Sequence, residues 1–291
     1  MNWDDVRIFL AVARSGQILG AARALNLNHA TVARRLTALE TALGSRLFTR
    51  RTNGSDLSPS GERFLMHAEA MESAMMAASE SAGADSLIDG TVRVGAPDGF
   101  GVAFLAPRLG ELIERHRGLR IELVPVPRAF SLSRREADIA VTLERPREGR
   151  LVARKLTDYR LGLYASQRYL DDHGVPASLA DLSAHRLVGY VEDLLYTASL
   201  DYTAEFLKDW RSSLAVSSAM GQTAAVRAGA GIGILHSFMA GPDSGLVPVL
   251  PLHTLTRSYW TVVHEDLRTI RRVALVADFL TEIVNRDRTI F

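Results

Sequence analysis

The 291-residue chain has no cysteine, so disulfide bridges, thiolate metal sites and cysteine nucleophiles are excluded together. It also lacks any run of about 18 apolar residues that could cross a bilayer. Its start, MNWDDV, does not have the basic and then apolar order of a secretory signal. The eight histidines are scattered, without metal-ligand spacing. We therefore expect a cytoplasmic globular protein with no membrane contact, bound metal or cofactor.

Positive charge is concentrated near the start of the chain. Residues 1 to 63 hold nine arginines and five acids, a net charge of +4, whereas the whole chain carries +1. A small basic segment attached to a mildly acidic body favours a polyanion as the partner of that segment alone. A solvated charged surface is the alternative that these counts leave open.

The start of the chain predicts three short helices. Apolar spacing predicts a helix over residues 4–14, and the small residues of LGAARALNL predict a second one. Asn28 has the side chain expected at the N-cap of a third helix, and Gly44 is a typical C-cap. Within the third helix, one apolar stripe is formed by Val32, Leu36, Leu39 and Leu43.

The outward face of the third helix is small and polar, apart from one arginine. At about 100° per residue, Arg34 lies away from the apolar stripe, whereas Arg35 is rotated toward the packing side. Two helices joined by a tight turn match a helix-turn-helix, whose second helix enters the DNA major groove. We expect Arg34 to contact a guanine edge and Arg35 to meet a phosphate or an internal acid. The alternative is an amphipathic helix with solvated arginines.

A hairpin is predicted directly after these helices. The stretch SRLFTRRTNGSDLSPSG has two short strand patterns around a turn at Asn53-Gly54. Arg46, Arg50 and Arg51 lie on or near this ribbon, where a wing would touch backbone phosphates. Solvent-exposed arginines beside a turn are the alternative.

An alanine pair, the pattern RRL..LE..LG..LF.R and a closing LSPSG occur together between residues 3 and 63. In this combination they resemble the winged helix-turn-helix of LysR-type transcriptional regulators. The resemblance implies that DNA is contacted by Asn28, His29, Ala30, Thr31, Arg34, Arg35, Arg50 and Arg51. The turn departs from the family, because His29 stands where glutamine is common and Ala33 where serine is common. This departure leaves the operator sequence open.

A long helix is predicted from residue 60, because no glycine or proline occurs between Gly61 and Gly83. Its apolar residues recur with a period of 3.5, at Phe64, Ala68, Met71, Met75, Ala78 and Ala82. This period is typical of a helix that packs along another helix. We interpret it as a linker helix that forms a dimer, as the resemblance also implies, with packing on the chain's own domain as the alternative. The following segment, GADSLIDG, predicts a hinge. The sequence does not decide whether the protein is a dimer or a tetramer.

Strands alternate with helices beyond residue 90, which indicates an α/β domain with a parallel sheet. One helix is expected over 102–116. The resemblance continues here to the family's effector domain, which is like type II periplasmic binding proteins and implies two lobes. It implies chain crossovers near Leu161–Tyr164 and Val263–Glu265, and a last helix over 267–285 that returns to the first lobe.

The expected fold is thus multidomain α+β. Its parts are a winged helix-turn-helix over 1–59, a linker helix and hinge over 60–90, and an effector-binding domain over 91–291. The lobes of that domain are expected at 91–162 with 264–291, and at 163–263.

A small ligand is expected between the two lobes. Strand-to-helix junctions at 95–99 and 217–221 would turn backbone N–H groups toward the cleft, which favours an anion such as a carboxylate. Asp98 either caps its own helix or selects a ligand with a hydrogen-bond donor. The predicted effector contacts are Pro97, Asp98, Gly99, Phe100, Arg128, Phe130, Thr142, Met220, Gly221 and His236. A surface or packing role is the alternative for Arg128, Phe130, Thr142 and His236.

Other functions fit the sequence less well. In GAGIG, residues 229–233, a helix precedes the glycines and a strand follows, the reverse of a dinucleotide-binding fingerprint. Hydroxymethylbilane synthases share the two-lobed architecture but need a cysteine, and no other catalytic constellation replaces it. The leading interpretation is a regulator that binds promoter DNA under the control of a small effector, and not an enzyme. A cytoplasmic solute-binding protein without DNA readout is the alternative.

Overall fold

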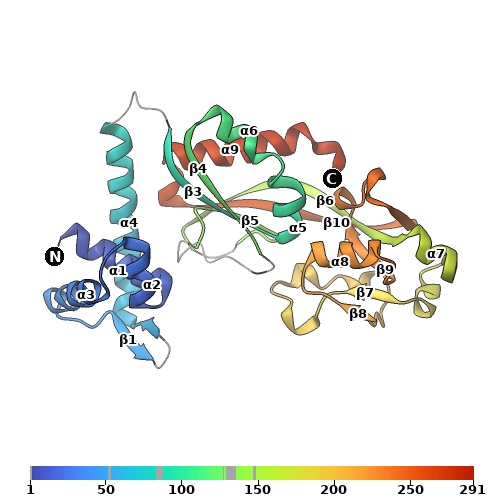
Figure 1. The fold of residues 1–291 in the computed structure, drawn as a ribbon, viewed down its shortest axis with the longest axis horizontal. Helices are drawn as coiled ribbons and strands as arrows, with labels where there is room; N and C mark the ends of the chain where they lie inside the picture. Colours follow the sequence, from blue (N-terminus) through green and yellow to red (C-terminus); the bar gives the residue numbers. More distant parts are fainter. Residues whose placement is uncertain (1, 52–53, 83–87, 127, 129–135, 147–148) are drawn as a thin grey trace. The chain divides into compact units, whose positions relative to one another are not determined.

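The computed structural model describes residues 2–51, 54–82, 88–126, 128, 136–146 and 149–291 (Figure 1). These residues form two compact units. The first, called the head, consists chiefly of the residues before 83, and the second, called the body, chiefly of the residues from 88 onward. No helix in these described ranges is long and apolar enough to cross a membrane.

Three helices open the head, as predicted: α1 (Trp3–Ser15), α2 (Ile18–Leu25) and α3 (His29–Leu43). A capping box starts α1, where the backbone N–H of Asp5 donates to Asn2 Oδ1 at 2.9 Å and the Asp5 side chain bonds back to the backbone of Asn2. The helices end in left-handed backbone conformations at Gly16, Asn26 and Gly44. These endings give the sharp turns that a helix-turn-helix needs.

A two-stranded ribbon and a long helix complete the head. β1 (Phe48–Arg51) pairs antiparallel with β2 (Gly54–Leu57), and α4 (Pro59–Ala82) follows. The predicted hairpin is therefore present, although Asn53 of its turn lies outside the described residues. The predicted linker helix is present as α4, and the predicted hinge lies almost wholly outside the described residues.

The core of the head surrounds Phe9 of α1. Its ring centroid lies 5.3 Å from that of Phe48 on β1 and 4.9 Å from that of Phe64 on α4. The α3 side chains that face this core are Val32, Leu36 and Leu39. Leu43 is 36% exposed, so the predicted stripe is one residue too long, because α3 ends there.

The LSPSG segment holds the ribbon against the start of α4. Ser58 Oγ donates to the Arg46 carbonyl oxygen at 2.6 Å and accepts from the Gly61 N–H at 3.0 Å. A Cβ atom at Gly61 would lie 2.0 Å from the Leu47 carbonyl oxygen, so only glycine fits. The motif therefore encodes a close backbone contact.

An eight-stranded mixed sheet forms the frame of the body, in the order β4-β3-β5-β10-β6-β9-β7-β8. Its strands are β3 (Asp89–Ala96), β4 (Gly118–Pro125), β5 (Ile139–Thr142), β6 (Leu151–Ser166), β7 (Leu187–Gly189), β8 (Leu214–Ala215), β9 (Ile232–His236) and β10 (Leu246–His264). β3 is parallel to β4 and β5, and β7 is parallel to β8 and β9. β6 and β10 are antiparallel to their neighbours, so the predicted parallel sheet is only part of the arrangement.

The long strands β6 and β10 run through both lobes. β6 pairs with β9 of the second lobe over Leu161–Tyr164. In β10, the register against β6 shifts between Val249 and Thr254, and residues 260–263 pair with β5 of the first lobe. Residues 260–263 of β10 already pair with β5 of the first lobe, so the second crossover lies before residue 260, and the predicted position at Val263–Glu265 is wrong. A strand that continues through both lobes carries no sequence boundary where it crosses.

Helices cover the sheet of the body. They are α5 (Asp98–Phe100), a π-helical turn (Gly101–Leu105), α6 (Leu109–Arg115), α7 (Gln167–His173), α8 (Ala219–Arg227) and α9 (Arg271–Arg286). The single helix predicted over 102–116 is wrong in its start and its continuity, since helical structure begins at Asp98 and breaks before Leu109. At Gly101 an added Cβ would lie 2.6 Å from Pro125 Cβ, so the first turns press closely on β4.

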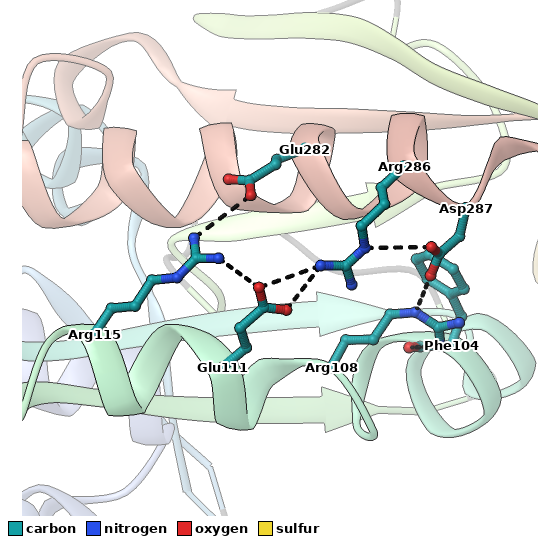
Figure 2. A network of polar contacts seen from close by, with 7 residues as sticks. All are labelled: Phe104, Arg108, Glu111, Arg115, Glu282, Arg286 and Asp287. Carbon is teal, nitrogen blue, oxygen red and sulfur yellow. Dashed lines mark hydrogen bonds and ion pairs between the residues drawn. The ribbon is translucent and has the colours of Figure 1, made fainter.

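An ion-pair network joins α9 to α6 in the first lobe (Figure 2). Arg286 Nη1 lies 2.9 Å from Glu111 Oε2, and Arg108 Nε lies 2.7 Å from Asp287 Oδ2. Arg115 bridges Glu111 and the neighbouring α9 residue Glu282. Hydrogen bonds from Arg286 and from Arg108 lower the pKa values of the Glu111 and Asp287 carboxyl groups, respectively. The prediction that the last helix returns to the first lobe is confirmed by these contacts.

Candidate nucleic-acid interface and effector cleft

The amino end of α3 presents a small polar surface. Asn28 is the N-cap, as predicted, because its Oδ1 accepts from the Ala30 N–H at 2.9 Å. Asn28, His29 and Ala30 are exposed, and Thr31 is half-buried. Short exposed side chains at this end let the backbone of a recognition helix approach DNA.

The two arginines of α3 have different surroundings. Arg34 is exposed and has no hydrogen-bond or ion-pair partner among the described residues. Arg35 pairs with α1, its Nη1 lying 3.2 Å from Asp4 Oδ2 and 3.9 Å from Asp5 Oδ1. Of the two partners expected for Arg35, the structure shows the internal acid. Arg34 is left as the long donor on the outer face.

Glu40 connects α3 to the first strand of the wing. Its side chain is nearly buried, and its Oε1 accepts from the Leu47 N–H at 2.8 Å and the Phe48 N–H at 3.3 Å. Arg46 Nη1 donates to Oε2 at 3.2 Å. A buried carboxylate is costly unless it is hydrogen-bonded, and these donors satisfy it. The sequence pattern contains Glu40 but gives no sign of this bridging role.

The wing carries the other predicted DNA contacts. Arg50 and Arg51 lie on β1, opposite Ser55 and Gly54 of β2, and their side chains are outside the described part of the structure. The Ser55 N–H donates to the Gly16 carbonyl oxygen at 2.8 Å, which fixes the ribbon to the end of α1. The contacts of Arg50 and Arg51 with DNA stay predictions.

The apolar stripe of α4 has two parts. Phe64 and Ala68 pack in the head core, so the alternative of packing on the chain's own domain holds for the first half of the helix. Met71 and Met75 are 37% and 50% exposed. The dimer interface along α4 stays a prediction. Among the described side chains of the stripe, these two methionines and the exposed Ala78 are left for it.

Three predicted effector residues come together in one pocket of the body. This pocket of about 270 Å³ is lined by Pro97, Arg128, Val141, Thr142, Leu143, Glu144, Tyr196, Thr197 and Ala198. Burial raises the pKa of the Tyr196 phenol, so its hydroxyl is a donor at neutral pH. Phe130, also predicted, lies outside the described residues.

Asp98 reaches across to the second lobe. Ser218 Oγ donates to its Oδ2 at 2.5 Å. The Met220 N–H, at the amino end of α8, donates to the same oxygen at 3.3 Å. Gly99 is also in this contact, because a Cβ there would lie 3.1 Å from Ala219 Cβ. The Gly221 N–H donates to Ser218 Oγ at 3.1 Å. The expectation that α8 would offer free N–H groups is wrong, since the Asp98 carboxylate already occupies that end.

Two further predicted residues belong to an aromatic core between the lobes. The Phe100 ring is fully buried, 4.5 Å from the ring of Tyr259. His236 stacks on Tyr159 at 5.1 Å, and Tyr159 stacks on Tyr259 at 4.1 Å. Burial lowers the pKa of His236 to about 4, so its ring is neutral at pH 7. Neither Phe100 nor His236 lines the pocket. The structure supports the packing alternative for His236, and Phe100 is a core residue as well.

Glu144 is a pocket residue that the sequence analysis missed. Its Oε1 accepts from Ser199 Oγ at 2.7 Å, from the Ser199 N–H at 3.0 Å and from the Thr197 hydroxyl. Thr142 Oγ1 donates to the Glu144 carbonyl oxygen at 2.7 Å, which shapes the turn after β5. The position of Glu144 two residues beyond a strand end was the available signal.

A winged head with an exposed recognition helix, and a two-lobed body with a small pocket, define a DNA-binding regulator that senses a ligand. Within the described residues, no group of three or more histidine, aspartate or glutamate side chains could hold a metal ion.

Family comparisons agree with this class. Residues 3–62 match the model of the bacterial regulatory helix-turn-helix protein of the lysR family, and residues 85–284 match the LysR substrate binding domain. The regulator CrgA of Neisseria meningitidis is 29% identical over 97% of this chain and 96% of its own length. The activator TtdR of Escherichia coli is 26% identical over 95% of this chain and 91% of its own. The solved structure of CrgA covers 97% of this chain and 98% of that chain, with a TM-score of 0.60.

The chain therefore belongs to the LysR family of DNA-binding transcriptional regulators. These relatives are regulators and not enzymes, which agrees with the function expected from the sequence.

Proposed function

We propose that this regulator recognises promoter DNA with the exposed amino end of α3 and with its wing. The observation that supports the proposal most directly is Arg34, an exposed guanidinium without a protein partner among the described residues, beside Asn28, His29 and Ala30. A guanidinium in this position can donate two hydrogen bonds to a guanine edge. Self-association through α4, as a dimer or tetramer, would present two such helices to two half-sites.

Replacing Arg34 tests this proposal. Arg34→Ala in the full chain should weaken specific DNA binding by about 1–3 kcal/mol, or roughly 5- to 150-fold in Kd, and relax base preference at one position per half-site. The measurement is fluorescence anisotropy at several salt concentrations, with DNA fragments first selected by the wild-type protein.

Arg35→Ala is the matched control, since it removes the same charge from the neighbouring position. Because Arg35 pairs with Asp4, we expect a smaller loss and an unchanged base preference. Equal affinity and equal preference in wild type and Arg34→Ala would contradict the proposed recognition. A solute-binding protein without DNA readout, the alternative function, would show no salt-dependent DNA binding at all.

We further propose that a small effector, with an anionic group such as a carboxylate, binds in the pocket between the lobes. Asp98 fills the amino end of α8, so the support for an anion now comes from Arg128 in the pocket wall. A pocket of about 270 Å³ suits a small molecule. Effector binding need only favour one lobe arrangement by a few kcal/mol to change DNA binding. Selecting DNA fragments with and without candidate carboxylates tests this step.

A regulator of this kind works where the DNA is. We therefore propose that the protein acts in the cytoplasm.

A further inference from the structure

Two carboxylates of the first lobe hold two helical turns of the second lobe. Asp98, after β3, accepts hydrogen bonds at the amino end of α8. Glu144, after β5, accepts them at the 3-10 turn Ala198–Leu200. We infer that Asp98 and Glu144 form a clasp that holds the two lobes together, and that a ligand with a hydrogen-bond donor releases it at Glu144.

The Asp98 half of the clasp is built to stay closed. Asp98 is only 7% exposed, and its partner Ser218 is itself oriented by the Gly221 N–H. The neighbouring Gly99 lets the two backbones approach, since even a methyl group there would press on Ala219. A carboxylate that leaves these donors would remain buried without replacement partners, which is costly.

The Glu144 half is built to open. Glu144 is exposed, so water can replace its partners at little cost. Glu144, Thr197 and Ala198 all line the pocket, so a bound ligand touches both sides of this contact. A donor group on the ligand would compete with Thr197 and Ser199 for the same carboxylate oxygen. Two contacts with unequal resistance let one side of the cleft open while the other remains attached.

The clasp also narrows the chemical class of the effector. A ligand that only carried an anionic group would have no favourable interaction with Glu144 and would not release it. We therefore expect a molecule with an ammonium, amide or hydroxyl donor in addition to the anionic group proposed above. The identity of this ligand depends on the proposed function, whereas the closed clasp does not.

Hydrogen exchange of the full-length protein, read by mass spectrometry, tests the clasp. In Glu144→Ala, the segment that contains the Ser199 amide should exchange about tenfold faster, because that N–H loses its 3.0 Å bond to Glu144 and keeps only the longer one, 3.4 Å, to Thr197 Oγ1, while the start of α8 is unchanged. In Asp98→Asn, the segment that contains the Met220 amide should be the faster one. Glu192→Ala is the control, an exposed glutamate of the second lobe, and should change neither segment. Unchanged exchange at Ser199 in Glu144→Ala would overturn the clasp.

The release step is tested with two simple probes, methylammonium chloride and sodium formate, at equal ionic strength. Methylammonium should speed exchange at Ser199 in wild type and have no further effect in Glu144→Ala, and formate should have no effect. A response to formate alone, or to neither probe, would overturn release by a donor. DNA binding of the wild type is measured separately, so its absence would contradict the proposed function and leave the exchange results standing.

Discussion

The head and the body each contain a carboxylate that is nearly buried and that joins two structural elements, but the two carboxylates work over different distances along the chain. Glu40 accepts from the Leu47 N–H, seven residues away, and fixes a helix to the adjacent strand. Asp98 accepts from Ser218, 120 residues away, and fixes one lobe to the other. A local contact forms with its own element, whereas a distant one can be made or broken without unfolding either partner. The first type makes the head rigid. The second type holds two lobes together, and in the proposed clasp Asp98 is the contact that stays closed while Glu144 opens.

The cores of the two units also differ: the head has one shared core, whereas the two lobes of the body meet at separate contacts. In the head, α1, α3, β1 and α4 share one cluster around Phe9. In the body, the lobes meet through the clasp and through stacked rings such as Tyr159 and Tyr259 on the two long strands. A single core substitution should therefore destabilise the whole head, whereas a single substitution between the lobes should remove only one contact of the body.

The largest effect is expected from Gly61→Ala in the head. The new Cβ would lie 2.0 Å from the Leu47 carbonyl oxygen, which accepts from the Ser58 N–H at 2.9 Å. Gly61 is itself held by its N–H bond to Ser58 Oγ, so neither can move aside easily. We expect a loss of about 3 kcal/mol in the stability of the head, together with loss of DNA binding. Thermal unfolding and anisotropy measure the two effects.

Gly110→Ala is the matched control in the body. An added Cβ at Gly110, within α6, would meet no atom within 4 Å. Because alanine favours a helix more than glycine, this variant should gain about 0.5 kcal/mol and keep its DNA binding. If both variants had equal stability, the rigid close packing of the head would be refuted.

A smaller loss is expected from Glu40→Ala. It leaves the Leu47 and Phe48 N–H groups without their acceptor, and an unsatisfied buried group costs about 1–3 kcal/mol. We expect about 2 kcal/mol of destabilisation and faster amide exchange at the start of β1. Glu114→Ala, which truncates an exposed glutamate of α6, should change stability by no more than about 0.5 kcal/mol. A Glu40→Ala variant as stable as this control would contradict the bridging role.

The head could be predicted from the sequence because its signals are local. The N-cap Asn28 and the C-cap Gly44 act within a few residues, the closing LSPSG bonds Arg46 only 12 residues away, and all appear where expected. Arg34 could be assigned to the outer face because helical rotation is fixed by the apolar stripe. The choice between a phosphate and an internal acid as the partner of Arg35 could not be made from the sequence, since Asp4 is 31 residues away on another helix.

The body was predicted less well because its site is assembled from distant segments. The rule that ligands bind near the carboxyl ends of strands holds for three residues: Pro97 and Arg128 follow strands, Thr142 ends β5, and all three line one pocket. The same rule placed Phe100 and His236 at the cleft, although their rings are buried between the lobes. Nothing local indicates that Asp98 and Glu144 have partners beyond residue 195, or that β10 enters the first lobe before residue 260.

The smallest effect is expected where the body depends on exposed ion pairs between α6 and α9 (Figure 2). The hydrogen bond from Arg286 lowers the pKa of Glu111 below its ordinary value of 4.5, so this carboxylate stabilises the fold above that pH. The contribution is lost as the pH falls through the lowered pKa. Glu111→Gln should therefore melt slightly below wild type at pH 7, with a gap that closes toward pH 3. Glu114→Gln on the same helix is the control: Glu114 is exposed and makes no ion pair with the described residues, so this variant should melt close to wild type at pH 7. If the difference in melting temperature widened in acid, a stabilising Glu111 carboxylate would be contradicted. A difference at pH 7 that shrank in 1 M salt would support it, because salt screens exposed ion pairs.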